Sequence, residues 1–257
     1  MTASSLFDLS GRTALITGSS GGLGLAIAEA LAESGASVIL NGRDESKLAT
    51  SVRALTSRGF SASASAFDVC DEAAVQAAFA AFDTNGIVVD ILVNNAGIQF
   101  RKPMLELNSA DWRRVLETNL TSAFVVGREA ARRMVSRSKG GKIINIGSLN
   151  SEVARTTTAP YTAAKGGIKL LTRSMAAEWA VHGIQANAIG PGYIDTEMNK
   201  ALTSDPKFDA WVRSRTPSGR WGLPRDLAGT AIFLASPASD YVNGQIIYVD
   251  GGMLAVL

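Results

Sequence analysis

Short runs of β-favouring residues alternate with longer Ala- and Leu-rich segments along the whole chain, and this alternation limits the folds that the chain can adopt. Strands are predicted at 13–17, 37–41, 61–67, 90–93, 142–147, 184–189 and 245–249. Helices are predicted at 23–33, 44–57, 71–82, 108–134, 161–181 and about 225–235. Because two parallel strands need a crossover that places a helix on a face of the sheet, we expect an α/β fold. It should have a seven-stranded parallel sheet with helices on both faces.

The composition is that of an ordinary globular protein. Of the 257 residues, 46% are hydrophobic and 19% are charged, which excludes a disordered or collagen-like chain. The 25 basic and 23 acidic residues leave a net charge of +2, so the charge balance gives no reason to expect nucleic acid as a partner. We find no internal repeat and no linker, and we expect residues 1–257 to form a single domain.

Cysteine and histidine are too scarce for several kinds of site. Cys70 and His182 are the single residues of their types, which excludes an intrachain disulfide and a His/Cys zinc cluster, so we expect no bound metal. Ser-His-Asp catalysis would depend on His182, and no G-x-S-x-G element accompanies it. Residues 1–11 lack the pattern of a signal peptide, and no apolar run reaches about 18 residues. We therefore expect a cytoplasmic protein that has no membrane partner.

The loop after the first predicted strand has the glycine spacing of a nucleotide site. Residues 17–24 read TGSSGGLG, which puts Gly18, Gly22 and Gly24 between a strand and a helix. Glycines there allow a tight turn, a close phosphate and close packing of the helix, whose N-terminus offers free N–H groups to a pyrophosphate. A lone glycine triplet is common, but its place in the first β–α–β unit favours a dinucleotide site.

The residues after the second predicted strand favour NADP over NAD. An NAD site usually has an acidic residue here for the ribose 2′-hydroxyl, whereas a 2′-phosphate favours an arginine. This chain has the neutral Asn41 at the strand end and Arg43 two residues later, so we predict NADP (NADPH) as the cofactor. Asp44 is expected to cap the next helix, and the alternative for Arg43 is a solvated surface side chain.

Two further strand ends carry polar residues. Asp68 and Val69 follow the third predicted strand, where the Asp68 carboxylate could accept a hydrogen bond from the adenine amino group. Residues 94–97 read NNAG after the fourth strand and bring two amide side chains to the same edge of the sheet. Taken alone, this segment is more typical of a turn than of a binding site.

A serine, a tyrosine and a lysine form the candidate catalytic group. Ser148 follows the fifth predicted strand, and Tyr161 and Lys165 are four residues apart on a predicted helix, so they share one face. An ammonium group near the phenol is expected to lower the pKa of Tyr161 and let it exchange protons near neutral pH. Asn119 has a low helix propensity; it could open the long predicted helix and pass protons towards Lys165 through water. A Tyr-x-x-x-Lys pair also occurs by chance on solvated helices, but the combination with the serine and the nucleotide loop favours catalysis.

These motifs together resemble those of one enzyme family. In chain order they are the glycine loop, residues 94–97, Asn119, Ser148, Tyr161, Lys165, Pro191 and Gly192. The chain is similar in this respect to the short-chain dehydrogenases/reductases. The resemblance implies a single-domain Rossmann fold, a homotetramer, Tyr161 as the acid/base, Ser148 as the group that orients the reacting oxygen, and Lys165 on the nicotinamide ribose.

The resemblance and the strand-end positions together give the expected cofactor contacts. These are Gly18, Ser20, Gly22, Leu23, Gly24, Asn41, Arg43, Asp68, Val69, Asn95, Ala96, Gly97, Tyr161, Lys165, Pro191, Gly192, Ile194 and Thr196.

A subgroup of the family carries further similar stretches. Residues 95–103 (NAGIQFRKP), 151–152 (SE), 215–222 (RTPSGRWG) and 249–253 (VDGGM) resemble bacterial gluconate 5-dehydrogenases. The similarity implies NADP-dependent interconversion of D-gluconate and 5-keto-D-gluconate. Gly147 and Asn150 depart from the pattern of this subgroup, in which Cys and Gln are expected.

The predicted strand-end loops agree with a hydroxylated, anionic substrate. They carry Gln99, Arg101, Lys102, Asn150, Glu152 and Arg155. An arginine fork pairs well with a carboxylate, although loop arginines and lysines are often simply solvated. We expect Arg101, Asn150 and Arg155 to contact the substrate together with Ser148 and Tyr161.

Other functions remain open at this point. The alternatives are a reductase of another sugar acid, a polyol or a 3-oxoacyl thioester, and a dinucleotide-binding regulator without catalysis. Trp211 and Trp221 frame a polar segment in which no helix is predicted, and we interpret this segment as a lid over the substrate.

Overall fold

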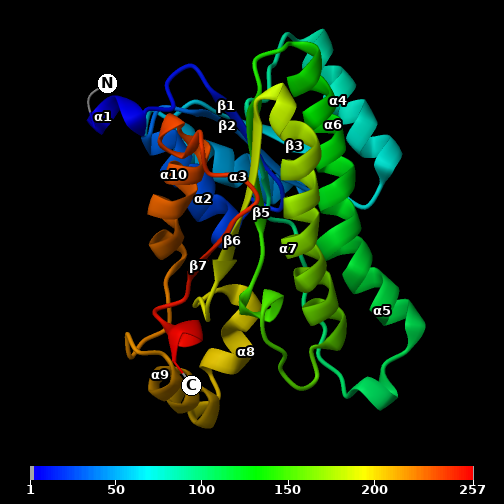
Figure 1. The fold of residues 1–257 in the computed structure, drawn as a ribbon, viewed down its shortest axis with the longest axis vertical. Helices are drawn as coiled ribbons and strands as arrows, with labels where there is room; N and C mark the ends of the chain where they lie inside the picture. The colour runs from blue at the N-terminus through cyan, green and yellow to red at the C-terminus, as the bar shows by residue number, and fades with distance from the viewer. Residues whose placement is uncertain (1–2, 257) are drawn as a thin grey trace.

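A seven-stranded parallel sheet forms the centre of the molecule (Figure 1). The computed structural model describes residues 3–256. The strands are β1 (Thr13–Ile16), β2 (Ser37–Gly42), β3 (Ala62–Ala66), β4 (Ile91–Asn94), β5 (Gly141–Ile146), β6 (Ile184–Pro191) and β7 (Ile246–Val249). Their order in the sheet is β3-β2-β1-β4-β5-β6-β7. The predicted parallel sheet is thus confirmed, and its order reverses between β1 and β4, where such sheets bind ligands.

Helices cover both faces of this sheet (Figure 1). One face carries α2 (Gly22–Glu33), α3 (Glu45–Thr56) and α10 (Ala228–Ala235). The other carries α4 (Glu72–Thr84), α6 (Ser122–Ser136), its N-terminal extension α5 (Ser109–Leu116), and α7 (Ala159–Trp179). Among residues 3–256, none of the helices has both the length and the apolar character that crossing a membrane requires.

Alternate side chains of the strands enter two separate apolar cores. In β1, Ala14 and Ile16 pack with residues of α2 and α10, whereas Leu15 packs with residues of α4, α6 and α7. All three side chains are fully buried. Successive side chains of a strand point to opposite faces, so a strand covered on both sides must be apolar throughout.

The segment between β6 and α10 differs from its prediction. No helix was expected there, but the structure has α8 (Lys200–Thr203) and α9 (Pro206–Arg215), which lie below the sheet in Figure 1. Asp205 caps α9 by accepting hydrogen bonds from the N–H groups of Lys207 and Phe208. An Asp-Pro pair at a helix start is a recognisable signal, so α9 was predictable from local chemistry.

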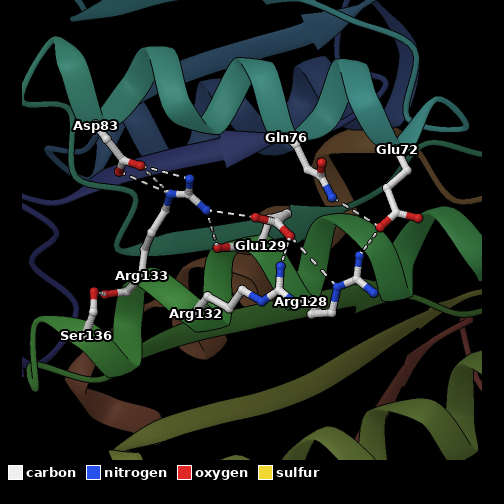
Figure 2. Close-up of polar contacts among 8 residues, drawn as sticks. All are labelled: Glu72, Gln76, Asp83, Arg128, Glu129, Arg132, Arg133 and Ser136. Atoms are coloured by element: carbon white, nitrogen blue, oxygen red, sulfur yellow. Dashed lines mark hydrogen bonds and ion pairs between the residues drawn. The ribbon is translucent and has the colours of Figure 1, made fainter.

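A charged cluster ties α4 to α6 on the outer surface (Figure 2). Glu129 of α6 is only 4% exposed, and its two carboxylate oxygens accept hydrogen bonds from Arg132 (2.6 Å) and Arg133 (2.9 Å). Arg133 also pairs with Asp83 of α4 at 2.8 Å, and Arg128 pairs with Glu72 at the other end of α4. The arginines therefore connect the two helices and neutralise the buried carboxylate.

Candidate active site

One large cleft lies along the carboxyl ends of the strands. It has a volume of about 910 Å³. All eighteen residues expected to contact a cofactor line it: Gly18, Ser20, Gly22, Leu23, Gly24, Asn41, Arg43, Asp68, Val69, Asn95, Ala96, Gly97, Tyr161, Lys165, Pro191, Gly192, Ile194 and Thr196. Asn119 and Ser148 line the same cleft. The structure therefore brings the predicted cofactor residues and the predicted catalytic residues to one place.

Two glycines of the loop have no space for a Cβ atom. Gly18 has a φ of +61°, and a Cβ there would lie 2.9 Å from the Cα of Ala96. A Cβ on Gly24 would lie 2.5 Å from the amide nitrogen of Asn95 and 2.6 Å from the carbonyl oxygen of Gly18. The loop is a cradle with room for a close phosphate at the start of α2, which fits the pyrophosphate of a dinucleotide.

Asn41 connects three strands beneath this loop. Its side-chain amide donates to the carbonyl oxygens of Ser65 and Phe67, each at 3.1 Å, and its side-chain oxygen accepts a longer bond of 3.4 Å from the N–H of Gly18. The side chain is 1% exposed. Asn41 lines the cleft, but its amide hydrogens are already used inside the protein.

Positive charge lies at the end of the cleft where β2 stops. Arg43 is largely exposed and pairs with Asp68 at 3.6 Å. Asp68 also accepts a hydrogen bond of 2.9 Å from the N–H of Cys70. Lys47, which the sequence analysis did not single out, lines the cleft beside them. Asp44 caps α3 as predicted, with its carboxylate on the N–H groups of Ser46 and Lys47.

Asn94 and Asn95 make more contacts than a simple turn would need. The Asn95 amide donates to the carbonyl oxygens of Thr17 and Gly18 at 2.9 Å, which joins the ends of β1 and β4. The Asn94 amide donates to Asn145 of β5 at 2.9 Å and to the Ala123 carbonyl oxygen of α6 at 3.2 Å. Both asparagines therefore fix the edge of the sheet on which the cleft is built.

Asn119 lies in a π-helical turn, Glu117–Thr121, between α5 and α6. Its amide donates to the carbonyl oxygens of Val115 (2.9 Å) and Ile98 (3.0 Å), and its side-chain oxygen accepts from the N–H of Ile98 at 3.2 Å. The predicted local opening of the long helix is therefore present. A π-turn leaves backbone groups free to bind elsewhere, and such turns are frequent at functional sites.

Ser151 joins the serine loop to the tyrosine helix. Its hydroxyl accepts a hydrogen bond from the N–H of Ser148 at 3.3 Å and donates to the carbonyl oxygen of Lys165 at 2.8 Å. The Lys165 ammonium in turn donates to the carbonyl oxygen of Ile146 at 2.6 Å. Hydrogen bonds through Ser151 and through the carbonyl oxygen of Ile146 therefore hold Lys165 next to the end of β5, where Ser148 lies. The sequence analysis missed the bridging role of Ser151, which only the three-dimensional contact reveals.

The protonation of Tyr161 differs from its prediction. Burial raises the pKa of Tyr161, and a side-chain hydrogen bond with Ser148 and the charge of Arg101 offset this only in part. Lys165, which is 4% exposed, was expected to lower the tyrosine pKa; instead, burial lowers its own pKa to about 8. The Lys165 ammonium lies 5.5 Å from the centre of the Tyr161 ring. The expectation was wrong in direction because removal from water outweighs the effect of the neighbouring charges.

The three residues expected only in the substrate site lie outside the lining of the cleft. Arg101 is near the mouth, where the charges of Arg155 and Tyr161 both affect its pKa. The Asn150 amide donates to the hydroxyls of Thr158 (3.2 Å) and Thr162 (2.7 Å), so the protein already uses it. The structure therefore brings Arg101 close to both Tyr161 and Arg155 but turns the Asn150 amide towards the start of α7.

Several cleft residues carry no motif that sequence analysis could use. Asn199 follows Thr196 by one helical turn, Cys70 lies beside Val69, and Arg114 and Thr118 enter from the α5 side. Each becomes recognisable only once the strand ends are placed. Within residues 3–256, no group of three or more His, Cys, Asp or Glu side chains could hold a metal ion.

Comparison with known proteins adds to this geometry. A family profile described as enoyl-(acyl carrier protein) reductase matches residues 18–254. A gluconate 5-dehydrogenase from Gluconobacter oxydans (strain 621H) is 47% identical over 257 residues, which cover 100% of both chains. A 5-keto-D-gluconate 5-reductase from Escherichia coli (strain K12) is 45% identical over 252 residues, which cover 98% of this chain and 99% of the relative.

A solved structure is similar over the same extent. The crystal structure of a gluconate 5-dehydrogenase from Burkholderia cenocepacia J2315, in complex with NADP and tartrate, superposes with a TM-score of 0.97. The two chains are 49% identical, and 100% of each is covered.

Proposed function

The chain belongs to the short-chain dehydrogenase/reductase family of oxidoreductases, and we propose that it uses NADP to interconvert D-gluconate and 5-keto-D-gluconate. The relatives at 45% and 47% identity are named for this reaction, written in its two directions. The observation that carries the proposal is a pair of neighbouring guanidinium groups, Arg101 and Arg155, of which Arg101 lies near Tyr161 of the dinucleotide cleft.

The cleft fits NADP. The glycine loop would hold the pyrophosphate, and Arg43 with Lys47 would face the 2′-phosphate. Asn95, Gly97, Pro191 and Thr196 line the same cleft as Tyr161, and the nicotinamide would lie among them. When bound, NADPH supplies the hydride that reduces the C5 carbonyl carbon. A relative at 49% identity was crystallised with NADP, which supports this choice of cofactor.

Tyr161 supplies the proton of the reduction. Its phenol donates the proton to the carbonyl oxygen as the carbon accepts the hydride, so the ketone becomes a secondary alcohol. The raised pKa of Tyr161 keeps the phenol protonated at neutral pH, which is the form that reduction requires. Ser148, which hydrogen-bonds Tyr161, would hold the same oxygen in place. In oxidation Tyr161 accepts the proton instead.

Lys165 and Asn119 are proposed to restore the proton. The Lys165 ammonium is anchored on the Ile146 carbonyl oxygen, and a pKa of about 8 lets it exchange protons near neutral pH. The π-turn at Asn119 offers backbone groups to a water chain towards Lys165. The ribose hydroxyls of the cofactor would complete the contacts of Lys165.

The substrate class follows from charge. Arg101 lies near Tyr161 and Arg155 lies near Arg101, and among residues 3–256 neither arginine forms an ion pair with a carboxylate side chain. Two guanidinium groups near the reacting position suit the carboxylate of a sugar acid and disfavour an acyl chain. Tartrate, which is bound in the Burkholderia relative, is likewise a hydroxylated anion. A non-catalytic regulator would not need the converged Ser148, Tyr161 and Lys165.

The assembly and location are part of the same proposal. We propose a homotetramer, because Phe124 on α6 and Leu170 on α7 are 42% and 60% exposed, which leaves apolar surface for a second chain. We also propose that residues 1–257 form one catalytic domain, since the sheet takes strands from residue 13 to residue 249. A cytoplasmic location fits a chain with a single cysteine.

The first experiment is to follow the NADPH absorbance of the purified protein with 5-keto-D-gluconate, with NADH in parallel. Fast loss with NADPH and slow loss with NADH are expected. Replacing Arg43 by Ser should then weaken the binding of NADPH and leave the binding of NADH unchanged. If NADPH binds but is not consumed, the substrate is another carbonyl compound. Equal rates with both cofactors would contradict the role given to Arg43.

A further inference from the structure

Arg101 and Arg155 form an incomplete cationic pair at the mouth of the cleft. The Nε atom of Arg101 is buried and has no hydrogen-bond partner among residues 3–256. Burial and then the charge of Arg155 lower the pKa of Arg101, so the two guanidinium groups repel one another. A buried donor without an acceptor and two unpaired cations together point to an anionic ligand that is added later.

Both arginines are held by one segment of the chain, residues 193–215. Arg101 donates from Nη2 to the side-chain oxygen of Asn199 at 3.4 Å. Asn199 is itself fixed, because its amide donates to the carbonyl oxygen of Ile194 at 2.9 Å. The guanidinium of Arg155 lies over the ring of Phe208, 4.3 Å from its centre. Each arginine thus has one contact from this segment that leaves most of its N–H groups free.

Phe208 is held rigidly in turn. Its ring packs against Tyr193 (5.6 Å between ring centres), Trp211 (5.3 Å) and Trp221 (6.3 Å). The Trp221 N–H donates to Asp209 at 2.8 Å, which anchors the cluster on α9. Four aromatic rings in mutual contact have little rotational freedom, so the position of the Phe208 face is fixed.

We propose that Asn199 and Phe208 are positioning residues that hold Arg101 and Arg155 apart at the separation needed for one substrate carboxylate. This inference rests on the proposed function, because it takes the carboxylate to be that of a sugar acid. Neither residue touches the reacting atoms. Asn199 orients Arg101 by a hydrogen bond, and Phe208 orients Arg155 through its ring face. The carboxylate bridges the two guanidinium groups and accepts from the free N–H groups, which relieves their repulsion.

The test compares binding of D-gluconate with binding of D-glucitol, which has CH₂OH where gluconate has its carboxylate. Calorimetry on the NADPH-loaded enzyme, in which gluconate has no hydride acceptor, is expected to show a Kd for gluconate about tenfold higher in Asn199→Ala and in Phe208→Leu. Phe208→Tyr keeps an aromatic face and should restore wild-type affinity. The matched control is Lys200→Ala, since Lys200 is next to Asn199 and its side chain is 70% exposed. This variant should change the Kd less than about twofold.

Two readouts separate positioning from a general loss of structure. Glucitol binding and NADP binding should stay within about twofold of wild type in all variants. Unchanged gluconate affinity in both variants would overturn the inference, as would an equal loss for gluconate and glucitol. Turnover of 5-keto-D-gluconate by the wild type tests the proposed function separately. A wild type that binds gluconate in this way but does not oxidise it would refute the function and leave the inference standing.

Discussion

The pKa values of two residues in the catalytic cluster are shifted in opposite directions. Burial raises the pKa of Tyr161 and lowers the pKa of Lys165 to about 8. Both shifts favour the neutral form, as expected for groups removed from water. The cluster therefore places the protonated phenol of Tyr161 next to the ammonium group of Lys165, which can release its proton.

Replacing Tyr161 by Phe removes the group that we propose to transfer the proton to the substrate oxygen. The variant is expected to lose at least about a hundredfold in kcat, in line with loss of general acid catalysis. NADPH affinity should stay close to wild type, because the ring and the Lys165 contact with Ile146 are retained. Steady-state kinetics and fluorescence titration with NADPH measure the two quantities. Retained turnover would refute the role of Tyr161.

The buried ammonium of Lys165 should make stability depend on pH. Between pH 8 and the ordinary lysine pKa of 10.5, the folded state binds fewer protons at this residue than the unfolded state. The cost of keeping Lys165 charged is therefore complete below pH 8 and disappears as the pH rises to 10.5. Relative to Lys165→Met, the free energy of unfolding of the cofactor-free wild type should rise with pH by an amount on the order of 3 kcal/mol.

Urea unfolding at pH 7 and at pH 10 checks this prediction. The Lys165→Met variant lacks the titrating group, so it corrects for other residues that titrate in the same range. If the free energy of unfolding changes by the same amount between pH 7 and pH 10 in both proteins, Lys165 is not buried as a cation.

At the scale of helices and strands, the sequence predicted most of the framework and failed where tertiary contacts decide. The seven strands and the helices that cover the sheet follow from the periodicity of the sequence, because each of them packs against the apolar cores. Helix α9 was missed although Asp205 and Pro206 signal its start, because its aromatic residues, Phe208 and Trp211, pack in a cluster that no periodicity reveals. Asn150 shows the same limit within the site, since nothing in the sequence reveals that Thr158 and Thr162 take its amide.

The charged cluster between α4 and α6 should stabilise the fold without affecting catalysis. Glu129→Ala removes a nearly buried carboxylate and leaves Arg132 and Arg133 without their shared partner. Because the arginines remain partly hydrated, we expect a loss of about 2 kcal/mol in the free energy of unfolding. Urea denaturation measures this loss, and kcat should be unchanged because the residues of the cluster (Figure 2) do not line the cleft.

A matched control is Glu178→Ala on the exposed side of α7. This variant should change the unfolding free energy by less than about 0.5 kcal/mol. Equal effects of the two substitutions would show that the Glu129 ion pairs contribute nothing to stability.

For the whole molecule, the exposed apolar surface on α6 and α7 predicts association. Light scattering at micromolar concentration is expected to give four times the mass of one chain. Phe124→Asp combined with Leu170→Asp places charges on that surface and should yield smaller species. Val88→Asp is the control, because Val88 is 48% exposed in the loop before β4, away from these helices. A wild type that is monomeric would contradict the proposed tetramer.

The strand order bears on how the chain assembles while it is being synthesised. After β1, β2 and β3 have paired, β4 joins the free side of β1, and β5, β6 and β7 each join the strand that preceded them in the chain. Each strand after β1 can therefore pair with a strand that has already been synthesised, and none has to be inserted between two others. We expect the glycine loop to form early in translation, and segment 193–215, which positions Arg101 and Arg155, to fold among the last parts of the chain. The emerging protein would then have its pyrophosphate cradle before it can recognise its substrate.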